Sequence, residues 1–227
     1  QSVDTFASYY TGSATAMDMH YSSNSVVFAN ANKQILLYST TPGPVQITIN
    51  TGHKAKIGTL AISPDKTKVL SGGYDYISQV HNLANGNLLC TFDELRGNII
   101  SSKIAADNDF YAFGSNEGYL YYGYISNCSK NVYNRTDYVL KSLDIIQSRN
   151  EIWLADGTPG FFIFNILSKT IVAYTLPTDN SNSIYDISAL SVVGLCTAQA
   201  FYLINYTGVV KFTLAYPTLY TQKCRIT

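Results

Sequence analysis

The stretch that decides the fold runs from Gly52 to Phe92 and reads GHKAKIGTLAISPDKTKVLSGGYDYISQVHNLANGNLLCTF. It contains four short apolar segments rich in β-branched residues, and turn sequences separate them, which is the pattern of strands joined by tight turns. The last turn is Asn85-Gly86, the pair that most strongly indicates a two-residue hairpin. The predicted strands are 57–62, 69–71, 77–81 and 88–92.

This stretch resembles a WD40 repeat. Gly52-His53 stands where the Gly-His pair of that family opens a repeat, and Ser63-Pro64-Asp65 matches the first turn. Val80-His81-Asn82-Leu83 occupies the position of the family's Trp-Asp pair. The resemblance implies a buried, hydrogen-bonded tetrad, whose members here would be His53, Ser71, Asp75 and, in place of the Trp, His81.

Four other segments carry weaker versions of the unit, without the Gly-His or Trp-Asp pairs of the family, at a spacing of about 40 residues. The sequence therefore predicts an all-β fold, a β-propeller of about five four-stranded antiparallel blades. One alternative is part of a six- or seven-bladed propeller. A β-sandwich is the other, but a sandwich has no reason to repeat such a unit. The predicted blades span about 11–51, 52–95, 96–137, 138–181 and 182–215.

The two ends of the chain lie outside these repeats. Residues 1–10 have strand character and either close the ring within the chain or are exchanged with a neighbouring subunit, because an unpaired strand edge invites another chain. Residues 216–227 form a C-terminal tail. The candidate assembly residues are Val3, Phe6, Tyr9, Tyr10 and Cys224.

The composition excludes several classes of protein. The chain has 227 residues with 15 basic and 15 acidic side chains, and nucleic-acid-binding proteins usually carry a basic excess. No apolar run approaches the ~18 residues that cross a membrane. Aromatic residues make up 13% of the chain, which argues against disorder. We therefore expect neither a nucleic-acid partner nor a membrane span.

Three features bear on the compartment. The chain begins with Gln1, as a secreted chain does after removal of its signal peptide. Sequons at Asn127, Asn134 and Asn205 fall in predicted turns, where N-linked glycans could be attached. Of the four cysteines, Cys90 and Cys128 are the expected disulfide pair if one forms. We expect an extracellular or cell-surface location, with the cytoplasm as the alternative.

No motif of a known enzyme class occurs, and the three histidines lack metal-ligand spacing, so we expect no catalysis, metal or cofactor. Acidic residues do recur on predicted first strands, which line the central channel of a propeller. They could hold a cation or serve a glycan-processing enzyme, although bonding to loop amides or water is the simpler interpretation. These residues are Asp18, Asp144 and Asp186. The three glutamates Glu94, Glu117 and Glu151 fall in or beside predicted turns, so an acid catalyst is not evident.

These observations predict a non-enzymatic, extracellular β-propeller that binds protein partners or assembles with copies of itself in a polymer or surface array. The family resemblance, rather than the composition, implies this scaffolding role. One alternative is a glycan-processing enzyme of the five-bladed propeller type. The other is an intracellular WD40 scaffold for protein interactions.

Overall fold

The computed structural model describes residues 14–20, 25–39, 45–134, 139–158, 160–175, 184–189, 193–197, 200–205 and 210–215. These residues form five antiparallel sheets of four strands each. Each sheet follows the order of the chain, so every strand pairs with its neighbour in sequence. Within the described ranges the only helical element is the 3₁₀ turn Gln147–Arg149.

We call the five sheets blades 1 to 5. Blade 1 contains β1 (Ala14–His20), β2 (Ser25–Asn30), β3 (Gln34–Ser39) and β4 (Val45–Asn50). Blade 2 contains β5 (Ile57–Ile62), β6 (Lys68–Gly73), β7 (Ser78–Asn82) and β8 (Leu88–Phe92). Blade 3 contains β9 (Ile99–Ile104), β10 (Phe110–Ser115), β11 (Tyr119–Tyr124) and β12 (Asn131–Asn134). Blade 4 contains β13 (Ser142–Ile146), β14 (Glu151–Ala155), β15 (Gly160–Asn165) and β16 (Thr170–Thr175). Blade 5 contains β17 (Ile184–Ala189), β18 (Val193–Thr197), β19 (Ala200–Ile204) and β20 (Val210–Ala215).

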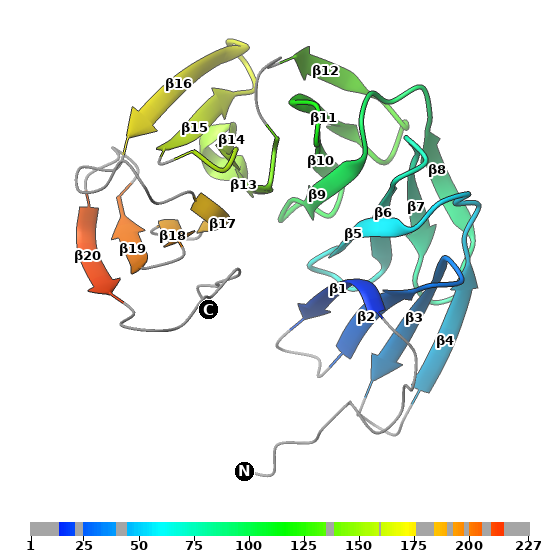
Figure 1. The fold of residues 1–227 in the computed structure, drawn as a ribbon. Coiled ribbons are helices and arrows are strands. Elements are labelled where there is room, and N and C mark those ends of the chain that lie inside the picture. Colours follow the sequence, from blue (N-terminus) through cyan, green and yellow to red (C-terminus); the bar gives the residue numbers. More distant parts are fainter. Residues whose placement is uncertain are drawn as a thin grey trace.

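The blades stand around a common centre, with the first strand of each innermost and the fourth outermost (Figure 1). Consecutive first strands lie side by side from β1 to β5, β9, β13 and β17. The prediction of an all-β propeller with about five four-stranded blades is therefore confirmed. The segment 1–10 and the tail 216–227 lie outside the described residues, so the alternatives of closure and exchange stay predictions.

Most buried apolar side chains pack between neighbouring blades, and one small cluster, Phe28, Leu36 and Tyr38, lies on blade 1 alone. Both faces of a middle blade are buried, because strand residues point alternately to its two neighbours. On β11, Tyr121 packs toward blade 2 and Tyr122 toward blade 4. In blade 4, every residue of β14 is buried. The core of the described residues thus consists mainly of four inter-blade layers, and each blade depends on the next.

Polar bonds between first strands reinforce these layers near the centre. The Asp18 carboxylate accepts a 2.8 Å hydrogen bond from the backbone N–H of Ile62. Ser142 Oγ accepts one of 3.2 Å from the backbone N–H of Ile187. The Thr59 and Ser102 hydroxyls lie 2.9 Å apart. Blades 1 and 2, 2 and 3, and 4 and 5 are therefore joined by side-chain hydrogen bonds as well as by packing.

Candidate binding surface on blade 2

The specific repeat carries a buried hydrogen-bond network. His53 Nδ1 lies 3.1 Å from Asp75 Oδ1, and His53 Nε2 lies 3.0 Å from Ser71 Oγ. The Asp75 carboxylate also accepts a 2.6 Å bond from the backbone N–H of Lys54. The network therefore ties the segment before β5 to the turn between β6 and β7.

Gly73 is required at the centre of this network. A Cβ on Gly73 would lie 2.1 Å from Asp75 Oδ1 and 2.5 Å from His53 Nδ1, distances that no real side chain tolerates. Only glycine leaves room for the carboxylate and imidazole to meet. The Gly72-Gly73 pair thus has a steric reason, which the sequence pattern alone does not reveal.

His81 departs from the tetrad that the resemblance implies. It is 2% exposed, and its Nδ1 has no hydrogen-bond partner among the described residues. Burial, and secondarily the nearby His53, lower the pKa of His81 to about 4. The structure therefore brings together three of the expected four residues, with His81 as a buried neutral side chain beside them.

The charges in the network are set by burial and by hydrogen bonds. Burial lowers the pKa of His53 below its usual value, although the adjacent Asp75 opposes that shift. Burial would raise the pKa of the Asp75 carboxyl, but the bond from Lys54 N–H and the proximity of His53 hold it below the usual value. Asp75 is therefore a carboxylate at neutral pH, beside a neutral imidazole.

The Asp75–His53–Ser71 arrangement has the bonding pattern of a catalytic triad. Ser71 is nevertheless 0% exposed, and its hydroxyl also lies within 3.3 Å of the Gln79 backbone oxygen. A nucleophile must reach its substrate, and this hydroxyl cannot. The network therefore joins the segment before β5 to the β6–β7 turn without presenting an accessible nucleophile.

Replacing His53 with alanine tests that structural role. The variant loses the bonds to Asp75 and Ser71 and leaves polar groups buried without partners, so we expect a loss of about 1–3 kcal/mol of unfolding free energy. Urea denaturation of both proteins measures it. An unchanged midpoint with an unchanged slope would show that the network does not stabilise the fold.

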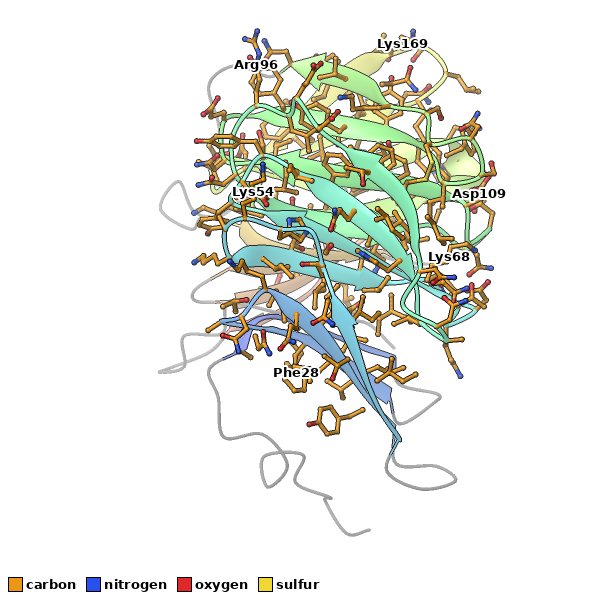
Figure 2. All side chains as sticks on the ribbon, turned by 90° about the vertical axis from the view of Figure 1, so that its right-hand side faces the viewer. Phe28, Lys54, Lys68, Arg96, Asp109 and Lys169 are labelled. Carbon is orange, nitrogen blue, oxygen red and sulfur yellow. A yellow bond between two sulfur atoms is a disulfide. The ribbon has the colours of Figure 1, made fainter. Side chains whose placement is uncertain are left out.

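The surface held by this network consists of residues 52–56 and 73–77, which we call the platform. Tyr74 N–H donates to Lys56 O at 2.9 Å, and the Lys56 ammonium lies 4.2 Å above the Tyr74 ring. The tip of the turn, Tyr76, is 51% exposed. Lys54 is labelled in Figure 2 on the same side of the molecule as Arg96, away from Lys68 and Asp109. The platform thus presents lysine and tyrosine side chains on a fixed backbone.

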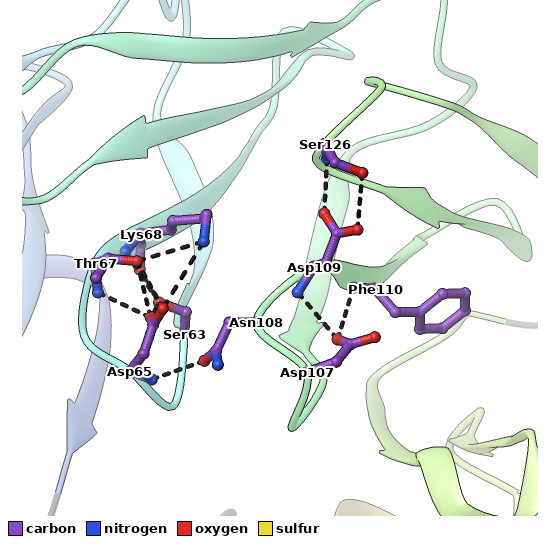
Figure 3. A network of polar contacts seen from close by, with 9 residues as sticks. All are labelled: Ser63, Asp65, Thr67, Lys68, Asp107, Asn108, Asp109, Phe110 and Ser126. Atoms are coloured by element: carbon purple, nitrogen blue, oxygen red, sulfur yellow. Dashed lines mark hydrogen bonds and ion pairs between the residues drawn. The ribbon is translucent and has the colours of Figure 1, made fainter.

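The opposite end of blades 2 and 3 carries a second polar network (Figure 3). Asn108 Oδ1 accepts a 2.7 Å bond from the Asp65 N–H, which joins the two blades. Asp107 Oδ1 accepts from the N–H groups of Asp109 and Phe110, and Asp109 accepts from the Ser126 N–H and hydroxyl. These carboxylates are used in shaping turns. No cluster suited to a metal ion occurs among the described residues.

The predicted channel carboxylates are likewise engaged. Asp18 bonds Ile62 as described above, and Asp144 accepts a 2.8 Å bond from the Ile145 N–H. Lys103 of blade 3 lies 3.3 Å from Asp144, which is 4% exposed. The side chain of Asp186 lies outside the described residues. Asp18 and Asp144 therefore accept hydrogen bonds from backbone amides of strand residues, whereas the simpler interpretation expected loop amides or water.

Other predicted site residues are placed as follows. Cys90 and Cys128 form a disulfide that joins β8 of blade 2 to the turn after β11 of blade 3. Asn127 and Asn134 are exposed, and Asn205 is half-buried. The assembly candidates Val3, Phe6, Tyr9, Tyr10 and Cys224 lie outside the described residues. Glu151 directly follows the turn at 147–150, where it was expected, and as the first residue of β14 it is buried and accepts a hydrogen bond from Trp153 Nε1.

Comparison with known proteins places the fold but assigns no activity. No protein-family model and no curated protein matches the chain. The crystal structure of RRP9 WD40 repeats matches it with a TM-score of 0.68 at 12% identity, covering 86% of this chain and 76% of that one. The structure of U3-55K matches with a TM-score of 0.67 at 12% identity, covering 86% and 77%. No helix in the described ranges is long and apolar enough to cross a membrane. The chain therefore has the fold of a WD40-like β-propeller.

Proposed function

We propose that the chain is a non-enzymatic scaffold that binds protein partners through the platform of blade 2. The observation that carries the proposal is the buried His53 network, which fixes two loops and leaves their Lys and Tyr side chains exposed. A rigid surface loses little entropy on binding, and Tyr supplies a large contact area with a polar tip. The fold alone does not specify this function, because unrelated functions share one fold.

No comparable observation supports an enzymatic function. The serine of the triad-like network is fully buried, and Asp144 is paired with Lys103. A glycan-processing enzyme needs two accessible carboxyl groups on either side of a substrate, one of which gives up a proton. Asp18 and Asp144 instead serve as acceptors for backbone N–H groups. We therefore propose binding rather than catalysis.

The likeness to WD40 repeat structures favours the intracellular scaffold over the extracellular assembly module. One observation favours the extracellular location, because the Cys90–Cys128 disulfide would persist in an oxidising compartment. Alkylation of native material without reductant, followed by mass spectrometry, separates the two. The intracellular scaffold predicts that Cys90 and Cys128 are alkylated and that Asn127 and Asn134 carry no glycan. An intact Cys90–Cys128 disulfide together with a glycan on Asn127 or Asn134 would instead assign the protein to the extracellular location.

Site-specific photocrosslinking tests the proposed function. A benzophenone amino acid replaces Lys54 on the platform or, as the matched control, Leu167, which is 74% exposed in the β15–β16 turn at the other end of blade 4. We expect crosslinked adducts of defined mass from position 54 only. The crosslinked partner is then identified, and its affinity for the chain is measured with purified proteins. Adducts from neither position would contradict a protein-binding function. Adducts from position 167 alone would show that the binding surface lies at the end of the propeller that carries Leu167.

A further inference from the structure

Tyr76 has a backbone conformation that is unusual for a large side chain. Its φ is +62°, and it is the only aromatic among the eight described non-glycine residues with positive φ. The left-handed region brings Cβ close to the backbone carbonyl, so glycine and asparagine are favoured there. At the matching position of the β10–β11 turn, Gly118 has a φ of +82°. The turn thus requires this conformation, and blade 2 meets the requirement with an aromatic residue.

No polar or ring contact among the described residues accounts for the tyrosine. Tyr76 is 51% exposed, and its side chain has no hydrogen bond, ring stack or cation contact among the described residues. Its neighbour Tyr74, by contrast, lies against Gly58 and under the Lys56 ammonium. Strained residues of this kind persist where the surrounding structure holds them, often at binding sites. Tyr76 therefore strains the turn without a compensating hydrogen bond, ring stack or cation contact among the described residues.

The turn that carries Tyr76 is held from both sides. Gly73 N–H donates to Ile77 O at 2.9 Å, which closes the turn, and Tyr74 N–H donates to Lys56 O. Asp75, the residue before Tyr76, is fixed by His53 and by the Lys54 N–H. The ring therefore projects from a backbone that is already ordered before any partner arrives.

The charges around Tyr76 indicate the chemistry of its partner. Lys54 and Lys56 are exposed, and both extend from the segment bonded to the Tyr76 turn. Asp75 is the only acidic residue of the platform, and its carboxylate is already occupied by His53 and Lys54 N–H. Two exposed lysines on the segment bonded to the turn that carries an exposed phenol ring complement carboxylates next to an apolar or aromatic residue.

We propose that Tyr76 is the anchor of a docking surface for an acidic protein segment, with Lys54 and Lys56 contacting its carboxylates. This inference rests on the proposed function and names the partner class of that same platform. Nucleic acid is the less suitable anion, because the chain has 15 basic and 15 acidic residues and no basic stripe. The strain at Tyr76 is retained because the ring contributes to binding.

Selection of displayed random 12-residue peptides on the purified full chain tests the proposal. We expect selected peptides rich in Asp and Glu with an apolar or aromatic residue, and binding that weakens as salt is raised. The Tyr76→Gly substitution should weaken the best peptide at least about tenfold. It should also leave the melting temperature unchanged or raise it by about 2–4 °C, because glycine relieves the strained turn. Combined loss of affinity and retained stability is the signature of an anchor.

Controls make each outcome decisive. Leu167→Ala removes an exposed apolar side chain from the other end and should bind as the parent does, whereas Lys54→Glu with Lys56→Glu should weaken binding. A lower melting temperature for Tyr76→Gly, unchanged affinity, or tighter binding of a single-stranded oligothymidine would overturn the proposal. Peptides that bind Tyr76→Gly equally well would leave the proposed function standing. Failure to select any peptide, together with an absence of photocrosslinks, would remove both.

Discussion

Replacing Trp153 with alanine should cost about 3–5 kcal/mol of unfolding free energy, which is typical when a large aromatic side chain is removed from a core. Trp153 is 0% exposed and stacks on Phe161, with ring centroids 5.1 Å apart and planes at 6°. Phe161 stacks in turn on Tyr174 at 5.0 Å. The substitution therefore opens a cavity in the layer between blades 4 and 5 and leaves Glu151 without its indole donor.

A matched control on the same blade separates packing from a general loss of apolar surface. Val172 of β16 is 51% exposed, so Val172→Ala should change stability by less than about 0.5 kcal/mol. Chemical denaturation followed by circular dichroism measures both variants. Equal and small effects would show that the inter-blade layer is not where the stability resides.

Acidification should destabilise the protein through His81 before most carboxylates titrate. The folded pKa of His81, about 4, lies below the ordinary 6.5, so the unfolded chain binds the proton first as the pH falls. The contribution of His81 is complete above the unfolded pKa and is lost between 6.5 and 4. We expect a loss of about 2 kcal/mol at pH ~5 relative to pH ~8, approaching about 3 kcal/mol near pH ~4.

The variant His81→Phe isolates this effect. Phenylalanine removes the titrating group and the buried Nδ1 that has no partner, so stability near neutral pH should change little while the acid-dependent loss becomes smaller. A residual loss should remain, because burial lowers the pKa of His53 as well. Urea denaturation across the pH range provides the measurement. An identical pH dependence in both proteins would rule out His81 as the source.

The residues from Gly52 to Phe92 could be interpreted from sequence because this stretch resembles a WD40 repeat, and the resemblance implies where the polar network lies. His53 and Asp75 were predicted to share a network, and the structure places them in one. Asn85-Gly86 was predicted as a hairpin turn, and it joins β7 to β8, with Gly86 at a φ of +74°. Short-range turn chemistry and a repeated unit are therefore sufficient to predict the propeller class.

Other features depend on contacts that no local pattern encodes. The first strand of blade 2 shifts register between Ile57 and Thr59, and this irregularity gave no sequence signal. Glu151 lies beside a turn as expected, but nothing in its local sequence indicates that it is buried and bonded to Trp153 Nε1. The pairing of Lys103 with Asp144 joins residues 41 positions apart on different blades. The left-handed backbone of Tyr76 could not be predicted from its residue type, because tyrosine does not favour that conformation. Only its equivalence with Gly118 in the next blade indicates it.

Hydrogen exchange of the chain with and without a selected acidic peptide tests most directly the claim that the platform is the binding surface. The account predicts that protection increases in residues 52–56 and 73–77, which the His53 network joins, while the β15–β16 turn around Leu167 exchanges as before. Protection confined to the turns at the opposite end of the blades, around residues 63–67 and 105–109, would contradict it.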